Sequence, residues 1–294
     1  MNMETTTKDG PLLRLALPKG RMAEGVRLLL EDSGIRLRTG ERGYRPSVSV
    51  AGFEVKILKP QNIIEMLHAG SRDIGFAGAD WVAELGVNLV ELVDTGMDPV
   101  SLVAAAPRLL LVDGKLPQRA LVVASEYPKL TERWIEKQSM PIKLVRSYGA
   151  TEVFPPEDAD CIIDITQTGS TLRANGLSIV DELLTSSTRL YANAAALEDP
   201  VKRGMIDDFV VLVKSVLEAR DRVMLEVNVP SARFDELIAV LPCMRKPTVA
   251  RLHGEDGYAV KAAVPKHTLP SLIPQLKQCG GTDVVVTRLN QIVP

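Results

Sequence analysis

The sequence predicts an α/β protein with two lobes, followed by a separate C-terminal domain. Three observations indicate this fold class. Short apolar runs alternate with helical stripes from residue 12 to residue 217, as in parallel sheets covered by helices. After Arg222 the order becomes β-α-β-β-α-β, which is the ferredoxin-like unit. At 294 residues, with 46% hydrophobic and 24% charged residues, the chain is long enough for two or three domains.

The composition and charge exclude several other classes of protein. A net charge of −2 and an isoelectric point near 6.0 indicate no basic surface for nucleic acid or for an anionic membrane. No uncharged run approaches the ~18 residues that cross a bilayer, and the polar start MNMETTTKDG has no apolar signal-peptide core. Three distant cysteines and three scattered histidines fit no disulfide framework or metal site. We therefore expect a cytoplasmic protein with reduced thiols, a frayed N-terminal tail, and no nucleic-acid or membrane partner.

The first lobe is predicted as short strands that lead into helices whose apolar residues recur at core-facing spacing. Two connections carry chemistry. Pro18-Lys19-Gly20-Arg21 joins the first strand to its helix, and Asp80 is a suitable N-cap for a helix that begins at Trp81. The expected strands are residues 12–17, 53–57, 73–78, 100–105 and 189–193, and the other expected helices are residues 22–32, 63–68 and 200–217.

The second lobe follows a loop around Asp113-Gly114, where the chain crosses over and later returns. Its expected strands are residues 120–124, 142–145 and 161–163, with a helix over residues 127–137. We place the first lobe at residues 1–106 with 190–218, the second lobe at 107–189, and the C-terminal domain at 219–294.

The most informative stretch is residues 160–177, which read DCIIDITQTGSTLRANGL. A buried strand leads through six small or polar residues, 166–171, into a helix. Such a loop offers converging N–H groups, hydroxyls and the positive end of a helix dipole, which together suit a phosphate. An ordinary connection with a Ser or Thr N-cap remains an alternative from the loop alone. The loop is not a P-loop, because no Lys-Ser or Lys-Thr follows a G-x-x-x-x-G spacing.

Two cations precede the first helix. Lys19 and Arg21 lie where the helix dipole is positive, which is the unfavourable end for a positive charge. An anion bound between them would explain their placement, and two solvated side chains are the alternative.

Several segments resemble the ATP phosphoribosyltransferases. Asp164-x-x-x-Thr168-Gly169-x-Thr171-Leu172, with Asn175-Gly176-Leu177 behind it, is similar to that family's loop for phosphoribosyl pyrophosphate (PRPP). Pro18-Lys19-Gly20-Arg21, the segment from Asp73 to Asp80, and Gly149-Ala150-Thr151-Glu152 are similar to further family signatures. The resemblance therefore covers nearly the whole chain.

The resemblance implies an enzyme, a pentosyl-transferring glycosyltransferase that condenses ATP with PRPP to N1-(5-phosphoribosyl)-ATP and pyrophosphate in the first step of histidine biosynthesis. It implies that the two lobes share the fold of the periplasmic binding proteins. It also implies Mg²⁺ carried by the substrate, with no metal ligand from protein side chains, and a homo-oligomer, either a dimer or a hexamer.

The resemblance also assigns the site residues. Asp164, Lys19 and Arg21 are expected to be catalytic, with Asp164 on the ribose hydroxyls. Asp160 lies four residues before Asp164 on the same strand face, roughly 13 Å away if the strand is continuous, and is the weaker candidate. The expected PRPP-binding residues are Asp160, Asp164, Thr166, Gln167, Thr168, Gly169, Ser170 and Thr171, and the expected ATP-binding residues are Lys19, Gly20, Arg21, Gly78, Asp80 and Glu152.

Three segments depart from the family pattern. Asn62 stands where the family usually has Asp. Thr95-Gly96-Met97-Asp98-Pro99 matches a glycine-rich family segment only weakly, and Phe154-Pro155-Pro156-Glu157-Asp158 replaces a run that ends in Gly-Leu-Ala-Asp.

The C-terminal domain has no cluster of acid, base or nucleophile, which favours a sensing or assembly role. The resemblance implies an ACT-like domain that marks the long form of the enzyme and binds histidine as a feedback inhibitor, with contacts from Asn228, Thr248 and Ala262. Plain oligomerisation is the alternative. The expected strands are residues 223–229, 248–252, 258–264 and 283–289, and the expected helices are residues 234–241 and 269–276.

Two other functions remain open from the residues alone. A non-catalytic two-lobed sensor of small molecules would use the same fold, although the phosphate loop and the cations then lack a purpose. A phosphoribosyltransferase for another nucleobase would use the same loop, because only the resemblance points to ATP.

Overall fold

The computed structural model describes residues 12–38 and 43–293, so the predicted frayed tail lies outside the described residues. The chain divides into two compact units. The first unit holds Met1–Leu28 with Arg36–Asp207, and the second holds Leu29–Ile35 with Asp208–Pro294. The predicted site residues of both lobes fall in the first unit, and the predicted effector residues fall in the second.

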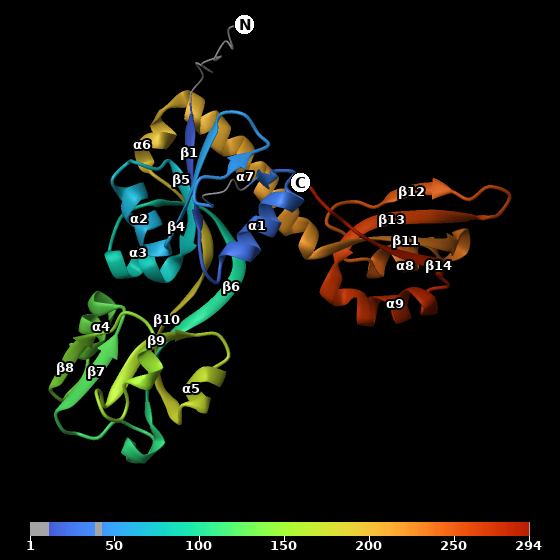
Figure 1. Cartoon of the computed structure of the whole chain (residues 1–294). Helices are drawn as coiled ribbons and strands as arrows, with labels where there is room; N and C mark the ends of the chain where they lie inside the picture. The colour runs from blue at the N-terminus through green and yellow to red at the C-terminus, as the bar shows by residue number, and fades with distance from the viewer. Residues whose placement is uncertain (1–11, 39–42, 294) are drawn as a thin grey trace, which may run out of the picture. The chain divides into compact units, whose positions relative to one another are not determined.

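One eight-stranded sheet runs through the whole first unit, in the order β4-β1-β5-β10-β6-β9-β7-β8 (Figure 1). Strands β1, β4 and β5 are parallel at one end, which we call lobe I, and β7, β8 and β9 are parallel at the other, lobe II. The strands are β1 (Leu13–Pro18), β4 (Phe53–Leu58), β5 (Ile74–Gly78), β6 (Val90–Pro107), β7 (Leu121–Ser125), β8 (Ile142–Arg146), β9 (Cys161–Thr166) and β10 (Leu177–Ala192).

In lobe I, helix α2 (Pro60–His68) follows strand β4, and helix α3 (Ala79–Leu85) follows strand β5. Helix α2 begins earlier than expected, at Pro60, because proline suits the first turn of a helix, where its missing N–H costs nothing. Its buried Ile63, Ile64 and Leu67 pack against Ala16 of β1 and Ala77 of β5. The remaining elements here are α1 (Ala23–Asp32), β2 (Leu37–Arg38), β3 (Ser47–Val48), α2 (Pro60–His68), α3 (Ala79–Leu85), α6 (Ala194–Glu198) and α7 (Pro200–Arg220).

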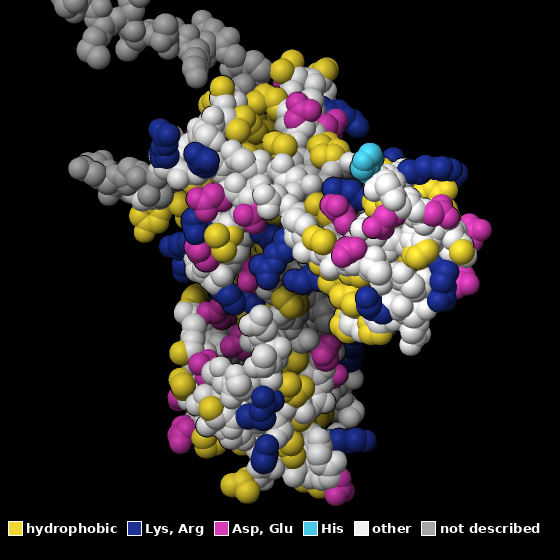
Figure 2. All heavy atoms as spheres, turned by 90° about the vertical axis from the view of Figure 1, so that its right-hand side faces the viewer, with side chains coloured by type: hydrophobic (Ala, Val, Ile, Leu, Met, Phe, Trp, Pro, Cys, Tyr) yellow, Lys and Arg dark blue, Asp and Glu magenta, His cyan; other side chains and the backbone are white. Residues whose placement is uncertain are grey.

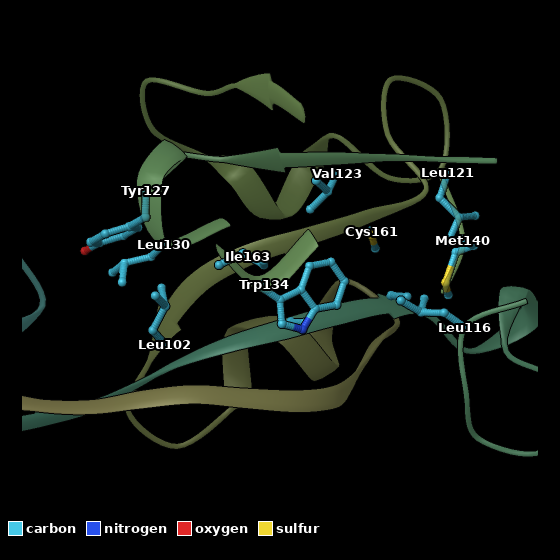
Figure 3. Packing of buried hydrophobic residues seen from close by; sticks show 12 residues of the cluster. Leu102, Leu116, Leu121, Val123, Tyr127, Leu130, Trp134, Met140, Cys161 and Ile163 are labelled. Carbon is cyan, nitrogen blue, oxygen red and sulfur yellow. The ribbon is translucent and has the colours of Figure 1, made fainter. Parts of the chain in front are cut away.

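Lobe II is built around an apolar cluster under helix α4, which Figure 3 draws. Trp134 of α4 is 4% exposed, and Cys161 and Ile163 of β9 are fully buried beside it. The expected buried strand is therefore confirmed. The helical elements of this lobe are η1 (Arg108–Leu110), α4 (Pro128–Ile135), η2 (Thr151–Val153) and α5 (Ser170–Ala174).

The two strands that join the lobes are longer than the sequence predicts. β6 and β10 pair antiparallel from Leu177 opposite Pro107 to Ala192 opposite Val90, with several bulges. Thr95–Pro99 lies inside β6, where Gly96 and Asp98 have positive φ angles of 64° and 50°. Polar residues and bulges interrupt the period-2 pattern, and so the sequence shows only the apolar ends of these strands.

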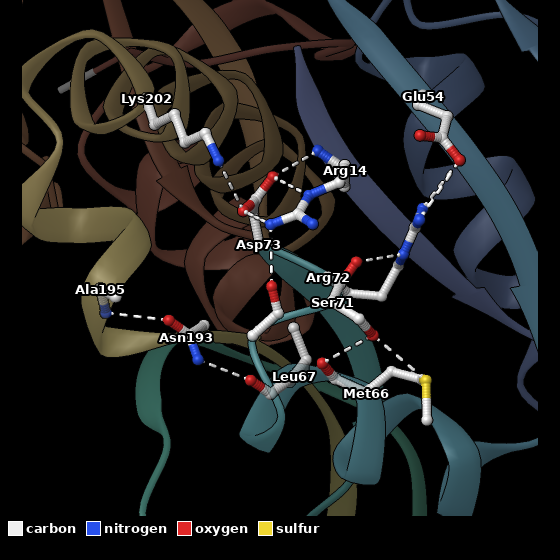
Figure 4. Close-up of polar contacts among 11 residues, drawn as sticks. Arg14, Glu54, Met66, Leu67, Ser71, Arg72, Asp73, Asn193, Ala195 and Lys202 are labelled. Atoms are coloured by element: carbon white, nitrogen blue, oxygen red, sulfur yellow. Dashed lines mark hydrogen bonds and ion pairs between the residues drawn. The ribbon is translucent and has the colours of Figure 1, made fainter. Parts of the chain in front are cut away.

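A buried ion cluster fixes the base of lobe I (Figure 4). Asp73, whose side chain is 3% exposed, accepts hydrogen bonds from the main-chain N of Arg14 at 2.7 Å and from Arg14 Nη2 at 2.8 Å. Lys202 Nζ of α7 lies 2.9 Å from Asp73 Oδ1. One carboxylate thus links β1, the start of β5, and helix α7.

The second unit contains a four-stranded antiparallel sheet in the order β12-β13-β11-β14. Val223, Leu225, Val227 and Val229 of β11 are each at most 3% exposed and pack in a core with Leu237 and Leu272 of the helices. This is the ferredoxin-like arrangement that the sequence predicts. The elements are β11 (Arg222–Pro230), η3 (Ser231–Arg233), α8 (Phe234–Val240), β12 (Thr248–Arg251), β13 (Gly257–Pro265), η4 (Lys266–Thr268), α9 (Leu269–Gln278) and β14 (Thr282–Arg288).

No helix among the described residues is both long and apolar enough to cross a membrane. On the face drawn in Figure 2, Lys and Arg side chains are mixed with Asp and Glu side chains. This mixed face agrees with the net charge of −2.

Candidate functional site

The predicted phosphate loop connects β9 to the short helix α5. Gly169 has a φ of 70°, a left-handed conformation that glycine adopts without the steric cost of a side chain. Its N–H donates to Thr166 Oγ1 at 2.9 Å, and Thr168 Oγ1 lies 3.0 Å from Ser170 Oγ. Within the described residues, the N–H groups of Thr171 and Leu172 donate to no acceptor, as expected in the first turn of a helix. The loop therefore presents free N–H donors beside its hydroxyl groups.

The loop lines a cavity of about 310 Å³, which lies within the usual size range of small-ligand sites. The cavity gathers most of the predicted PRPP-binding residues and also Glu152, which the sequence assigns to ATP. The lining residues are Glu152, Asp164, Ile165, Thr166, Gln167, Thr168, Ser170, Thr171 and Leu172.

Asp164 lies on the wall of this cavity, at the end of β9. Its Oδ1 accepts the N–H of Ile165 at 2.7 Å. Burial raises the pKa of Asp164 to about 6, and the nearby Glu126 and Glu152 carboxylates add to the increase. At neutral pH this carboxylate is ionised at an electrostatic cost, which hydroxyl donors or a metal cation from a ligand would relieve.

Arg173, which the sequence analysis did not single out, does not line the cavity but lies beside Gly169 of the loop. Its Nη1 lies 2.9 Å from the position that a Cβ on Gly169 would occupy, so the guanidinium folds back over the loop. In the described part of the chain, Arg173 makes no ion pair with a carboxylate. The sequence contains a signal for this placement: Arg173 comes four residues after Gly169, and residues four apart are neighbours on a helix.

Asp160 does not belong to this site. It lies just before β9, at the end opposite the loop, where its Oδ1 pairs with Arg119 Nη2 at 2.6 Å. Its Oδ2 accepts the N–H of Val122 at 2.8 Å. Both oxygens hold strand β7 in place, and we therefore remove Asp160 from the candidate PRPP site.

Lobe I presents a separate group of cations beyond its parallel strands. Lys19 and Arg21 are exposed, and the φ of Gly20, 79°, makes the turn between them. Lys19 Nζ lies 5.9 Å from the centre of the Tyr44 ring, and Arg21 Nη1 lies 3.4 Å from the carbonyl oxygen of Asp98. Neither cation pairs with a carboxylate within the described residues.

Lys59 is a second residue that the sequence analysis missed. It is the exposed N-cap residue of α2 and follows directly after β4. Because β4 pairs with β1 in parallel, with Leu58 beside Pro18, Lys59 comes at the same sheet edge as Lys19. The sequence could have indicated Lys59, because it follows a predicted strand, and ligands in such sheets bind beyond the carboxyl ends of the strands.

Asp80 has a different place from the one predicted. Helix α3 begins at Ala79 with Gly78 as its N-cap, so the prediction that Asp80 caps this helix is wrong. Asp80 is 3% exposed, and its two oxygens accept hydrogen bonds from Ser186 Oγ at 2.6 Å and Tyr127 OH at 2.8 Å. A Cβ on Gly78 would collide with Asp80 Oδ1. Asp80 is thus held inside the protein, and we remove it and Gly78 from the ATP contacts.

The remaining departures from the family pattern have local structural roles. Asn62 Nδ2 donates to Glu65 Oε2 at 3.1 Å on the surface of α2. The segment Phe154–Asp158 makes a turn in which the N–H of Asp158 donates to the carbonyl of Phe154 at 2.8 Å. These contacts explain how the chain accommodates both changes.

The three predicted effector residues do not line one pocket. Thr248 and Ala262 border a cavity of about 240 Å³ in the second unit, together with Arg245, Lys246 and Lys261. Asn228 is absent from its lining, and its Nδ2 donates to Asp283 Oδ2 at 3.1 Å. Ala262 borders this cavity and is also part of the core beneath the helices, with 6% of its surface exposed.

No group of three or more Asp, Glu, His or Cys residues is arranged to hold a metal ion in the described chain. Glu152 and Asp164 are the carboxylates that line the cavity next to the loop.

The fold and the loop define a two-lobed α/β protein whose cavity suits a phosphate ester, with a ferredoxin-like domain appended. Comparisons with known proteins give the family. Residues 59–215 match the family model for HisG, ATP phosphoribosyltransferase, and residues 219–291 match the model for the HisG C-terminal domain. The chain belongs to the ATP phosphoribosyltransferase family, with the C-terminal domain of its long form.

Curated relatives match over nearly the full length. An ATP phosphoribosyltransferase from Pelotomaculum thermopropionicum is 35% identical over 96% of this chain and 99% of its own. Another, from Desulforudis audaxviator, is 36% identical over the same shares. A chain from the ATP phosphoribosyl transferase (HisG:HisZ) complex of Thermotoga maritima matches with a TM-score of 0.63 at 26% identity, covering 70% of this chain and 99% of that one. The enzyme is therefore a glycosyltransferase of histidine biosynthesis that condenses ATP with PRPP.

Proposed function

We propose that PRPP binds in lobe II, with its 5′-phosphate on the loop and its ribose hydroxyls on Asp164. The observation that carries this proposal is the cavity of about 310 Å³, which places Asp164 and the hydroxyls of Thr166, Thr168, Ser170 and Thr171 around one space. Free N–H groups and hydroxyls favour a dianionic phosphate. Arg173 adds a positive charge above Gly169.

The chemistry places modest demands on acid–base groups. The N1 lone pair of adenine is available at neutral pH, so no base is needed to create the nucleophile. The enzyme must hold N1 in line with the ribose C1, stabilise an oxocarbenium-like centre, and neutralise the departing pyrophosphate. The ionised Asp164 supplies negative charge near the ribose, and the cations supply positive charge for the phosphates.

Mg²⁺ is proposed as the metal of the reaction, carried by the diphosphate of PRPP. It would neutralise charge on the leaving group. Asp164 and Glu152 are oxygen donors of the kind that Mg²⁺ prefers, and both line the same cavity. This proposal departs from the expectation that no protein side chain is a metal ligand: the substrate would bring the metal, and the two carboxylates would help to hold it.

ATP is proposed to use the cations at the edge of lobe I. Lys19 and Arg21 make no ion pair with a carboxylate of the described residues, and Gly20 forms the turn between them. Lys59 adds a third cation at the same sheet edge. Their place before α1 and α2 favours a bound anion, because cations alone are unfavourable at helix N-termini. Glu152 lines the cavity of lobe II, and we propose that it contacts ATP there, next to the ribose of PRPP.

The direct test is a turnover assay with ATP, PRPP and Mg²⁺, followed by ultraviolet absorbance with and without pyrophosphatase. Product that forms only with both substrates, and accumulates further with pyrophosphatase, supports the proposal. Replacing ATP by other nucleobases tests the rival nucleophiles. Binding of PRPP without turnover under every condition would instead favour the non-catalytic sensor.

We further propose that the second unit binds histidine and inhibits the enzyme from outside the active site, in a homo-oligomer that acts in the cytoplasm. Family membership and the cavity beside Thr248 support this proposal. Inhibition needs histidine to bind one state of the enzyme better than another, by typically 1–3 kcal/mol. Calorimetric titration of histidine into the whole chain, into Thr248→Val and into a chain without residues 219–294 tests it. Equal binding to the whole and shortened chains would exclude this domain.

A further inference from the structure

Helix α3 of lobe I contacts the beginning of helix α4 of lobe II through a buried carboxylate. Glu84, which is 3% exposed, accepts the N–H of Lys129 on Oε1 at 3.0 Å and the N–H of Leu130 on Oε2 at 2.9 Å. These N–H groups lie in the first turn of α4 and have no acceptor within their own helix. Lys129 Nζ donates to the carbonyl of Leu85 at 2.9 Å. One lobe therefore caps a helix of the other.

Tyr127 makes a second buried contact between the lobes. Its hydroxyl donates to Asp80 Oδ2 at 2.8 Å, and Trp81 stacks on its ring with centroids 4.6 Å apart. Ser186 of β10 donates to the other oxygen of Asp80 at 2.6 Å. Figure 3 shows the Tyr127 hydroxyl pointing away from the apolar cluster of lobe II. Burial and the Asp80 carboxylate raise the pKa of Tyr127 far above its ordinary value, so the hydroxyl keeps its proton and donates.

The same tyrosine is tied to the strand that carries the candidate site. The N–H of Tyr127 donates to Ser125 Oγ at 3.0 Å, and Ser125 Oγ donates to the carbonyl of Ile163 at 2.7 Å. Ile163 immediately precedes Asp164. A short chain of hydrogen bonds thus runs from Asp80 on lobe I to the strand of lobe II that ends in the phosphate loop.

We propose that Tyr127, supported by Glu84, is a positioning residue that fixes the spacing of the two lobes and so aligns ATP with PRPP. Its hydroxyl cannot reach a reacting atom, because it is buried and donates its hydrogen bond to Asp80. Alignment matters because a displacement of about 1 Å between bound reactants can reduce the rate about 100-fold. The inference rests on the proposed division of the substrates between the lobes.

The test compares Tyr127→Phe with a matched control. Tyr127→Phe removes one oxygen and keeps the ring that stacks on Trp81. The control is Trp134→Phe. This change removes the hydrogen bond that the indole Nε1 of Trp134 donates to the carboxylate of Asp181, which is also 2.8 Å long but lies within lobe II. For each variant we would measure kcat, KM for both substrates, the melting temperature, and PRPP binding by calorimetry without ATP.

The expected result is a fall in kcat of about 10- to 100-fold for Tyr127→Phe, with PRPP binding within about threefold of wild type. Trp134→Phe should have a lower melting temperature than wild type and an unchanged kcat. Glu84→Gln, which weakens the cap, should lower kcat in the same direction and decides the question if Tyr127→Phe fails to fold. A kcat within about twofold of wild type in the folded variants, or an equal loss in Trp134→Phe, would overturn the proposal. A wild-type chain that fails to bind PRPP would instead overturn the proposed function.

Discussion

Arg173 and Gly169 form one structural unit of the phosphate loop. Nη1 of Arg173 lies 2.9 Å from the point where a Cβ on Gly169 would stand, and Gly169 has a φ of 70°. The glycine therefore meets two requirements: a left-handed backbone, and room for a cation above it. The first two predictions separate these requirements.

Gly169→Val should reduce turnover by at least about 100-fold, because any movement of the loop removes aligned donors from the phosphate. The left-handed φ adds roughly 1–2 kcal/mol of strain. Gly114→Val is the matched control, because Gly114 has a similar φ of 76° and open space around it. The melting temperature should fall by a comparable amount in both variants, and only Gly169→Val should lose activity. Normal turnover of Gly169→Val would mean that the loop is only a connection.

Arg173→Ala should raise KM for PRPP about 10-fold or more, since a hydrogen bond to a charged group is worth about 1.5–3 kcal/mol. Arg119→Ala is the control, because Arg119 belongs to the same lobe but pairs with Asp160 at the far end of β9. Initial-rate kinetics at two salt concentrations provide the measurement. If both variants raise KM equally, the effect is one of overall charge and not of the loop.

Lys19→Ala should raise KM for a phosphate substrate or lower kcat, with no loss of stability. Removing a cation near the N-terminal end of a helix stabilises by roughly 0.3–1 kcal/mol when nothing is bound. Lys143, an exposed lysine on β8, provides the control variant Lys143→Ala. Kinetics and thermal melting would be measured together. A Lys19→Ala enzyme that melts earlier and keeps full activity would show a structural role.

Asp164→Asn should lower kcat/KM for PRPP by about 10- to 100-fold and flatten its dependence on pH. In the wild-type enzyme, kcat/KM should fall as pH falls through about 6, because protonation removes the acceptor charge. The raised pKa means that this carboxyl contributes stability below its unfolded pKa of 3.8 and loses it as pH rises through about 6. Asp164→Asn should therefore melt no earlier than wild type at pH 7–8. A variant that melts earlier there would contradict this electrostatic account.

Asp73→Asn should destabilise the protein by about 1.5–3 kcal/mol, because it removes the buried anion that the half-buried Arg14 and Lys202 share. Burial opposes ionisation of Asp73, yet the hydrogen bonds from Arg14 and Lys202 hold its pKa below the ordinary 3.8. Its stabilisation is thus present above pH 3.8 and is lost as pH falls through the lowered value. Urea unfolding at several pH values should show a weaker acid dependence in the variant. Unchanged kcat at temperatures where the variant is folded would confirm that the cluster is structural.

The parts of the site that the sequence predicts are those that depend on neighbouring residues. Residues 166–171 form the loop because a strand, a glycine and hydroxyls follow one another directly. Lys19 and Arg21 are equally easy to place, because they lie in the short segment between the first strand and helix α1. The ferredoxin-like domain follows from clean alternation along β11.

The role of Asp80 depended on partners that lie far along the chain. Tyr127 is 47 positions from it and Ser186 is 106 positions away. An aspartate near a helix start predicts a cap, and only the tertiary fold shows that it joins two lobes instead. The full length of β10 was missed for a related reason, since its middle is polar and pairs only with β6.

The position of β10 in the sheet also limits when the sheet can be completed during synthesis. β5 pairs on one side with β1 and on the other with residues 188–192 of β10, and all of lobe II is translated between them. Until those residues leave the ribosome, the strand IGFAG of β5, which is wholly buried in the folded protein, has an edge of unpaired N–H and C=O groups. Lobe II, whose strands β7, β8 and β9 are contiguous in the chain, can pair these three strands first. The half of the sheet that is translated first can therefore be completed only last, and until then its open edge can pair with other chains.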